Sequence, residues 1–295
     1  MPVSSSGPIK FSDIRNELGL INNIKMSTMQ NLAFSYSLTN KININTFRGY
    51  SGLPIIIENN INKQPILISG KIYYYLFTST TGTNTINFKK NTVCEILLVG
   101  GGGNYIYNGG SDSFNEFYAV GGAGNVYYNN LYNFNKGIYN ISIGINGINI
   151  FINSGISRYD MDYFQNINGE NTTISYNNSI ILQANGGTYP YRNGYYIKGG
   201  NSQLRTIING IDSGSIIYNG TDYADTTGIM TFSGAGANGN ATVSNGGNGY
   251  LSSITGIPTY YAGGGGANNG SGANYYGGSS ISNNYNGCVI IRFTL

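Results

Sequence analysis

The sequence predicts a mainly β protein, a β-sandwich with glycine-rich, polyglycine II-like segments that follows a short N-terminal segment with one or two small helices. The chain holds 45 glycines in 295 residues, well above the usual share of about 7%. Its glycine tracts alternate with short runs of isoleucine, valine and tyrosine, which are residues favoured in strands. Charged residues make up only 9% of the chain, against roughly 25% in ordinary soluble proteins. Such a composition suits a densely packed or assembled protein.

Residues 1–54 are predicted to be a separate N-terminal docking segment, because they contain the only plausible helices. Ser12 can cap a short helix that stops before Gly19, and Ser27 can cap a second one that runs through Leu32. Helices of this length are not stable alone and need a partner surface. The apolar residues expected to contact that partner are Ile9, Phe11, Ile14 and Leu18.

Residues 55–295 are predicted to form a glycine-rich β domain, in which residues 93–99 and 288–293 are central neighbours of one sheet. The glycine tracts lack the strict period of collagen, and tyrosine and isoleucine interrupt them too often for a flexible linker. We interpret them as extended helices of three residues per turn that pack closely enough to hydrogen bond to one another. Disorder of the tracts is the alternative interpretation. The predicted strands are 55–57, 65–69, 71–78, 85–88, 93–99, 138–143, 172–176, 179–184 and 288–293.

The two cysteines, Cys94 and Cys288, are predicted to be free thiols. In the first strand Glu95 marks one face, and Cys94 must point to the other face because strand residues alternate. In the last strand Arg292 marks the polar face, and Cys288 shares that face. If Glu95 and Arg292 lie on the same side of one sheet, the two sulfur atoms lie on opposite sides. Free thiols agree with assembly in a reducing cytosol.

The composition argues against catalysis, metal or cofactor binding and nucleic-acid binding. The chain has no histidine, which excludes Ser-His-Asp triads and imidazole metal sites. The closest carboxylate pairs, Asp160/Asp162 and Asp222/Asp225, are interpreted as polar loop residues rather than as half of a Ca²⁺ loop or a hydrolytic couple. The 15 lysines and arginines are scattered and form no basic stripe for nucleic acid. The sequence contains no run of 18 apolar residues, so no membrane span is predicted.

The tract Gly100–Gly103 follows an apolar strand, as in dinucleotide-binding folds. No helical pattern follows it to receive a pyrophosphate, so a nucleotide site is not predicted.

Paired tyrosines inside glycine-rich turns are the candidate adhesive surface. Adjacent tyrosines of a strand point to opposite faces, so one of each pair can pack while the other is exposed. Exposed tyrosine beside asparagine and glycine is typical of binding loops. The alternative is an ordinary β-sheet surface in an aromatic-rich protein. The candidate receptor-binding residues are Tyr260, Tyr261, Tyr275 and Tyr276.

Several stretches resemble viral structural proteins. Residues 1–14, followed by 47–50, resemble the N-terminal segment of many phage and large-DNA-virus structural proteins. The run 77–103 resembles the start of the glycine-rich domain found in viral tail-fibre and surface proteins. The run 252–266, closed by 287–293, resembles the end of that domain.

The resemblance implies a virion protein assembled in the host cytoplasm, with other virion proteins as partners. It also implies a β-sandwich carrying polyglycine helices, and host surface glycans or receptors as ligands, because related glycine-rich fibre tips bind receptors. The chain lacks the long shaft of a fibre, so a short fibre, a capsid-surface protein and a minor component all stay open. The low content of charged residues and the resemblance to fibre proteins both favour a homo-oligomer such as a trimer. The alternatives to a structural role are a receptor- or glycan-binding adhesin and, less favoured, a polysaccharide-degrading enzyme.

Overall fold

The structure, a computed structural model, is built from strands and extended segments. No helix occurs within the residues that it describes. The predicted helices at 12–18 and 27–32, like the rest of residues 1–54, lie outside those residues. The described residues are 55–57, 65–78, 80–81, 84–108, 117–148, 150–152, 168–193, 196–221, 224–226, 229–242, 244–266, 268–280 and 285–294.

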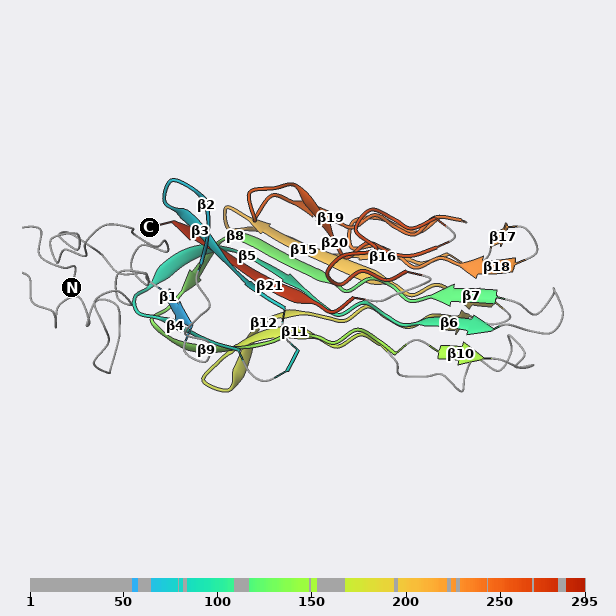
Figure 1. The fold of residues 1–295 in the computed structure, drawn as a ribbon, viewed down its shortest axis with the longest axis horizontal. Coiled ribbons are helices and arrows are strands. Elements are labelled where there is room, and N and C mark those ends of the chain that lie inside the picture. The colour runs from blue at the N-terminus through green and yellow to red at the C-terminus, as the bar shows by residue number, and fades with distance from the viewer. Residues whose placement is uncertain are drawn as a thin grey trace, which may run out of the picture.

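A five-stranded antiparallel sheet has the strand order β1-β4-β9-β11-β12 (Figure 1). Asn177 and Asn178 turn the chain between its last two strands, with φ of 50° and 62°. Two consecutive residues with positive φ are typical of the type I′ turn, whose twist matches a hairpin. The strands are β1 (Ile55–Ile57), β4 (Asn84–Phe88), β9 (Gly137–Ser142), β11 (Thr172–Tyr176) and β12 (Ser179–Ala184).

A seven-stranded sheet has the order β16-β15-β8-β5-β21-β3-β2. Strands β5 and β21 are antiparallel neighbours near its centre, as predicted, and Arg292 lies opposite Glu95. Strands β8, β15 and β16 were not predicted from the sequence. The bounds are β2 (Ile66–Ser69), β3 (Ile72–Phe77), β5 (Thr92–Val99), β8 (Val126–Phe134), β15 (Ser202–Ile208), β16 (Ile211–Tyr218) and β21 (Cys288–Thr294).

Two hydrophobic cores lie on opposite faces of the seven-stranded sheet. The first core joins the two sheets: Phe88 of β4 stacks on Phe134 of β8 with ring centroids 4.3 Å apart. The second core lies on the other face, where Leu97 of β5 and Ile290 of β21 pack with Tyr261. Tyr261 belongs to the small hairpin of β19 (Tyr250–Ser252) and β20 (Thr259–Tyr261), which covers this face. We call the two large sheets and this hairpin the base.

Beyond the base, the strands continue into extended segments that lie side by side (Figure 1). Strand β5 continues into residues 100–104, and residues 121–125 lead into β8. We call these segments the glycine bundle. Its members include 100–104, 121–125, 143–148, 168–171, 185–190, 199–201, 219–221, 233–236, 246–249, 262–266, 277–280 and 285–287.

Segment 100–104 shows how the glycine bundle is held together. The first and fourth of its N–H donors bond to the same neighbouring segment, 121–125, as expected for a chain with three residues per turn. Gly122 and Asn125 repeat the pattern, since both donate to segment 185–188. The N–H groups of 100–103 donate at 2.8–3.0 Å, in order, to the carbonyl oxygens of Asn125, Glu170, Tyr285 and Gly122.

Glycine is required in this segment by space rather than by backbone conformation. None of Gly100–Gly103 has a positive φ. A methyl group on Gly101 would overlap the carbonyl oxygen of Ile145, and one on Gly100 would overlap that of Asn185. Backbone atoms held by hydrogen bonds on both sides cannot move away cheaply, so the missing Cβ is what permits the packing. The segments that surround 100–104 are 121–125, 144–147, 169–170, 185–188, 277–278 and 285–287.

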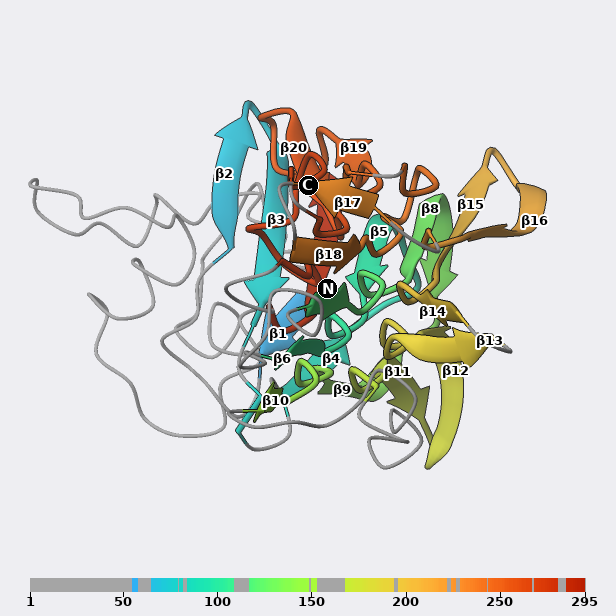
Figure 2. The same ribbon diagram turned by 90° about the vertical axis from the view of Figure 1, so that its right-hand side faces the viewer.

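A third sheet lies at the end of the molecule opposite the base (Figure 1). Its order is β10-β6-β7-β18-β17, with both parallel and antiparallel pairs. We call it the distal sheet; Figure 2 views the molecule from this end. A two-stranded hairpin of β13 (Tyr191–Asn193) and β14 (Tyr196–Lys198) is separate from it. The strands of the distal sheet are β6 (Tyr105–Asn108), β7 (Phe117–Val120), β10 (Ile150–Ile152), β17 (Ala224–Thr226) and β18 (Ile229–Phe232).

Candidate functional site

The four tyrosines predicted as an adhesive surface lie near one another, and Tyr261 is itself part of the second core. Tyr261 contacts Tyr275 edge to face at 5.5 Å between ring centroids, and Tyr275 contacts Tyr276 at 4.6 Å. Tyr260 and Tyr275 are exposed, Tyr276 is half-buried and Tyr261 is buried. The expected alternation is therefore confirmed for the pair Tyr260/Tyr261.

The tyrosine cluster also has a structural role, because one of its members is buried. Burial raises the pKa of Tyr261, and the nearby Cys288 and Tyr275 raise it further. A neutral phenol held in an apolar site stabilises the packing of its hairpin. Hairpin β19–β20 lies along the side of the molecule and not at its distal end (Figure 1). Only Tyr260 and Tyr275 of the four present a large exposed surface to a ligand.

A second aromatic pair lies in the distal sheet and was not singled out in the sequence. Tyr107 of β6 and Tyr118 of β7 are direct cross-strand partners, with ring centroids 4.7 Å apart and planes 22° from parallel. Both are half-buried, whereas Tyr105, two residues nearer the glycine bundle, is buried. Burial raises the pKa of Tyr105, and the neighbouring Tyr118 adds to that effect. The tyrosine face of this sheet therefore becomes more exposed with distance from the glycine bundle.

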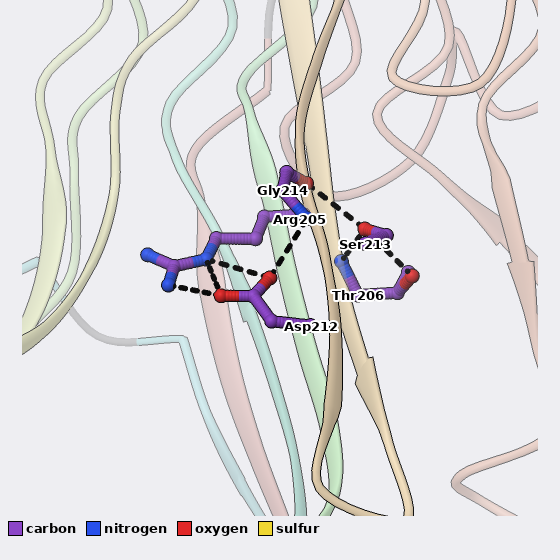
Figure 3. Close-up of polar contacts among 5 residues, drawn as sticks. All are labelled: Arg205, Thr206, Asp212, Ser213 and Gly214. Atoms are coloured by element: carbon purple, nitrogen blue, oxygen red, sulfur yellow. Dashed lines mark hydrogen bonds and ion pairs between the residues drawn. The ribbon is translucent and has the colours of Figure 1, made fainter.

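Hairpin β15–β16 at the edge of the seven-stranded sheet carries side-chain hydrogen bonds on both of its faces (Figure 3). Arg205 pairs with Asp212 through its Nε at 3.1 Å and also through Nη2. Asp212 Oδ1 accepts a hydrogen bond of 2.9 Å from the N–H of Gly214. Ser213 Oγ accepts one of 3.1 Å from the N–H of Thr206. The Arg205 guanidinium and the Gly214 N–H together lower the pKa of Asp212.

Two of the described carboxylates, Asp212 and Glu95, are each paired with an arginine. Asp212 pairs with Arg205, and Glu95 pairs with Arg292 at 3.0 Å while accepting a hydrogen bond of 2.7 Å from Tyr128. Within the part of the chain that the structure describes, no three His, Cys, Asp or Glu residues gather as metal ligands would. Asp160, Asp162 and Asp222 lie outside the described residues, and nothing is described of the Asp225 side chain.

The glycine tract after β5 offers no free N–H groups to a phosphate. All four N–H groups of Gly100–Gly103 donate to carbonyl oxygens of neighbouring segments. Phosphate-binding glycine loops, by contrast, point unpaired N–H groups at the ligand. The sequence-based rejection of a nucleotide site therefore has a structural reason, because these glycines form the interior of a bundle.

Asparagine side chains complete the glycine bundle where a neighbouring carbonyl is missing. Asn286 Oδ1 accepts a hydrogen bond of 3.0 Å from the N–H of Asn146, and Asn240 Oδ1 accepts one of 2.8 Å from that of Asn219. A side-chain amide thus replaces a main-chain acceptor. This role was missed in the sequence, although asparagine next to glycine is its signal.

The predicted docking residues Ile9, Phe11, Ile14 and Leu18 lie outside the described residues. Over the remainder, no helix is both long and apolar enough to cross a bilayer.

Comparison with known proteins identifies a family. A search among curated proteins finds no match. The model of the glycine-rich domain family matches residues 78–288, which run from the end of β3 to the start of β21 and include the whole glycine bundle. The described glycines that pack against a neighbouring main chain all lie in the region that the family model covers, and the chain belongs to the glycine-rich domain family.

Proposed function

We propose that this chain is a non-enzymatic structural component of a virus particle, a fibre-like or capsid-surface protein involved in assembly and in host attachment. Residues 1–54 would dock it onto another virion protein, through Ile9, Phe11, Ile14 and Leu18. We also infer that the two large sheets form a β-sandwich and that the glycine bundle is a polyglycine II lattice. The viral assignment rests on the resemblance of residues 1–14 and 47–50 to virion proteins.

The observation that supports a structural role most strongly is the use of glycine in the interior of the glycine bundle. Each main chain hydrogen bonds to neighbouring main chains in several directions. The glycine bundle between the base and the distal sheet is therefore rigid. Such a bundle suits a spacer that holds a surface away from its attachment point. No charged side chain is needed for this packing, which agrees with a charged fraction of 9%.

The test of this proposal is where the chain is found. Virus particles purified from cells that carry the viral genome encoding this chain should contain the chain. Cryo-electron microscopy of these particles should show the distal sheet pointing outward. A variant that lacks residues 1–54 should fold but should not be incorporated. Particles that lack the chain altogether, at full yield and infectivity, would rule out the structural role.

A receptor- or glycan-binding adhesin is the second candidate, and the stacked pair Tyr107/Tyr118 favours it. Two aromatic rings at the far end from the base give an amphipathic surface where a ligand would first arrive. On this candidate Tyr107→Ala with Tyr118→Ala should abolish binding on a glycan array or to host cells. Tyr260→Ala with Tyr275→Ala tests the cluster predicted from the sequence in the same assay. Unchanged binding in both double variants would remove the adhesin role from these tyrosines.

A polysaccharide-degrading enzyme is the least favoured candidate, because hydrolysis needs two carboxylates in one cleft. Asp222 and Asp225 are the residues to substitute. Loss of a measurable hydrolysis in both Asp→Asn variants would revive this candidate.

We further propose that the protein is a homo-oligomer, with a trimer as the form that the resemblance to fibre proteins favours. A weakly charged surface has little to keep copies apart.

A further inference from the structure

Hairpin β15–β16 exposes four isoleucines at the free edge of the seven-stranded sheet. Ile211 is 76% exposed, Ile217 62%, Ile208 47% and Ile216 43%. Figure 2 shows the hairpin standing out from the side of the molecule. An isolated exposed isoleucine is ordinary, but a group of them on a protruding arm is typical of an interaction surface.

Three of these isoleucines share one face of the hairpin. Ile208 lies opposite Ile211, and Ile216 lies opposite Leu204, whose side chain is buried in the second core. Residues 204, 206 and 208 alternate to the same side of β15. The hydrogen-bonded hydroxyls of Thr206 and Ser213 lie between Leu204 and Ile208 on this face, so the surface that extends outward from the second core is uncharged but not continuously apolar. We call Ile208, Ile211 and Ile216 the apolar face.

The charges of the hairpin lie on the opposite face. Arg205 and Asp212 pair with each other there (Figure 3), and Arg205 also lies over the ring of Tyr127, 6.0 Å from its centroid. Ile217, opposite Gln203, belongs to this second face. The apolar face therefore carries no charge that could select a charged partner.

The free edge of β16 is not suited to adding another strand. Gly214 has a φ of +69°, and the register shifts between Arg205 and Ile207. The N–H of Gly214 is already used by Asp212 (Figure 3). A bulge of this kind twists an edge and breaks the row of free backbone groups that a new strand would need. A partner must therefore cover the face of the hairpin and not extend its edge.

We propose that the apolar face of hairpin β15–β16 is the self-association surface, and that the same face of another copy covers it at the symmetry axis of a homo-oligomer. Groups that lie close to a symmetry axis meet their own counterparts, so a charge at that place would face a like charge. An uncharged stripe of isoleucines satisfies this condition, whereas the opposite face with Arg205 and Asp212 does not. This inference rests on the oligomer of the proposed function and identifies its contact.

The test compares the two faces of the same hairpin in the full-length protein. Sedimentation equilibrium should show an oligomer for the unaltered chain. Ile211→Ser combined with Ile216→Ser should weaken association by at least about tenfold per residue, as for truncated residues at the centre of an interface. Ile217→Ser, on the opposite face, and Ile257→Ser, which is 70% exposed elsewhere, are the matched controls and should leave association unchanged.

Cross-linking tests the same contact without removing it. The chain has two cysteines, both buried, so Ile211→Cys adds the one accessible thiol. Mild oxidation should then link two copies through residue 211, while Ile217→Cys should link few. A monomer at about 100 μM would overturn both the oligomer and its contact. Association that survives the double serine variant, or that Ile217→Ser weakens equally, would overturn the contact alone. Particle incorporation tests the virion role separately.

Discussion

Glu95 of β5 and Arg292 of β21 form an ion pair of 3.0 Å across the two central strands of the seven-stranded sheet. The pair lies on the side of the two strands that faces the second core. Cys94, next to Glu95, points into the first core, whereas Cys288, four residues before Arg292, points into the second. The two sulfur atoms therefore lie on opposite sides of one sheet, as alternation in the sequence predicted, and both thiols are free.

The two thiols should be unreactive in the folded protein. Burial raises the pKa of the Cys94 thiol to about 12 and raises that of Cys288 as well, so thiolate is scarce at neutral pH. A thiol reagent at pH 8 should label neither cysteine in native protein and both in denaturant. Non-reducing mass spectrometry that finds a Cys94–Cys288 bridge would contradict the arrangement.

Stability should fall in alkaline solution. Burial raises the pKa of Cys94 from 9.0 to about 12 and, with a contribution from Glu95, that of Tyr250 from 10.0 to about 12. Because the folded state keeps these protons to a higher pH than the unfolded state, the stability that these two groups contribute is constant below pH 9 and is lost as the pH rises toward 12. The slope is at most about 1.4 kcal/mol per pH unit for each group. Urea unfolding of Cys94→Ala beside the unaltered chain should show a shallower loss above pH 9.

Adjacent positions of one bundle segment should respond oppositely to a methyl group. A methyl group added to Gly122 would overlap the carbonyl oxygen of Asn201. The methyl group of Ala123, in contrast, is already packed in the second core. Gly122→Ala should cost more than about 3 kcal/mol or prevent folding, and Ala123→Gly only about 1 kcal/mol. Urea unfolding measures both. Equal costs would mean that the segments are not packed as described.

Another hydrogen-bond acceptor should be able to replace the side-chain oxygen of an asparagine in the glycine bundle, whereas the methyl group of alanine should not. Asn286→Ala leaves the N–H of Asn146 without its partner and should cost about 1 kcal/mol. Asn286→Asp keeps an oxygen at this position and should cost less. Amide exchange at Asn146 gives the local measurement: it should accelerate in the alanine variant only.

Amides inside the glycine bundle should exchange slowly. Gly101 and Gly187 donate to carbonyl oxygens in the bundle interior, whereas Gly210 lies at the exposed turn of hairpin β15–β16. Hydrogen exchange followed by mass spectrometry should show protected amides in the peptides that contain Gly101 and Gly187, and rapid exchange in the peptide that contains Gly210. Rapid exchange throughout the glycine bundle would contradict the scaffold on which the proposed function depends.

Some strands were invisible in the sequence for physical reasons. Strand β8 contains Asn129-Asn130, which resembles a turn; in the structure the side chain of Asn129 accepts a hydrogen bond of 2.9 Å from the N–H of Leu131 at a bulge opposite β5. Hairpin β15–β16, in contrast, has a clear signal in Asn209-Gly210, with φ of 51° and 80°, which is the preferred type I′ turn. That signal was available and was overlooked.

The sequence alone determined the strand-rich character, the two central strands and the opposite sides of Cys94 and Cys288, because alternation along a strand is a local property. It also indicated that the glycine tracts pack closely. Which tract meets which was decided only by the tertiary structure, since glycine has no side chain to mark its partner and any tract can bond to any other. The positions of the exposed isoleucines and of Tyr107 beside Tyr118 follow from that same long-range arrangement.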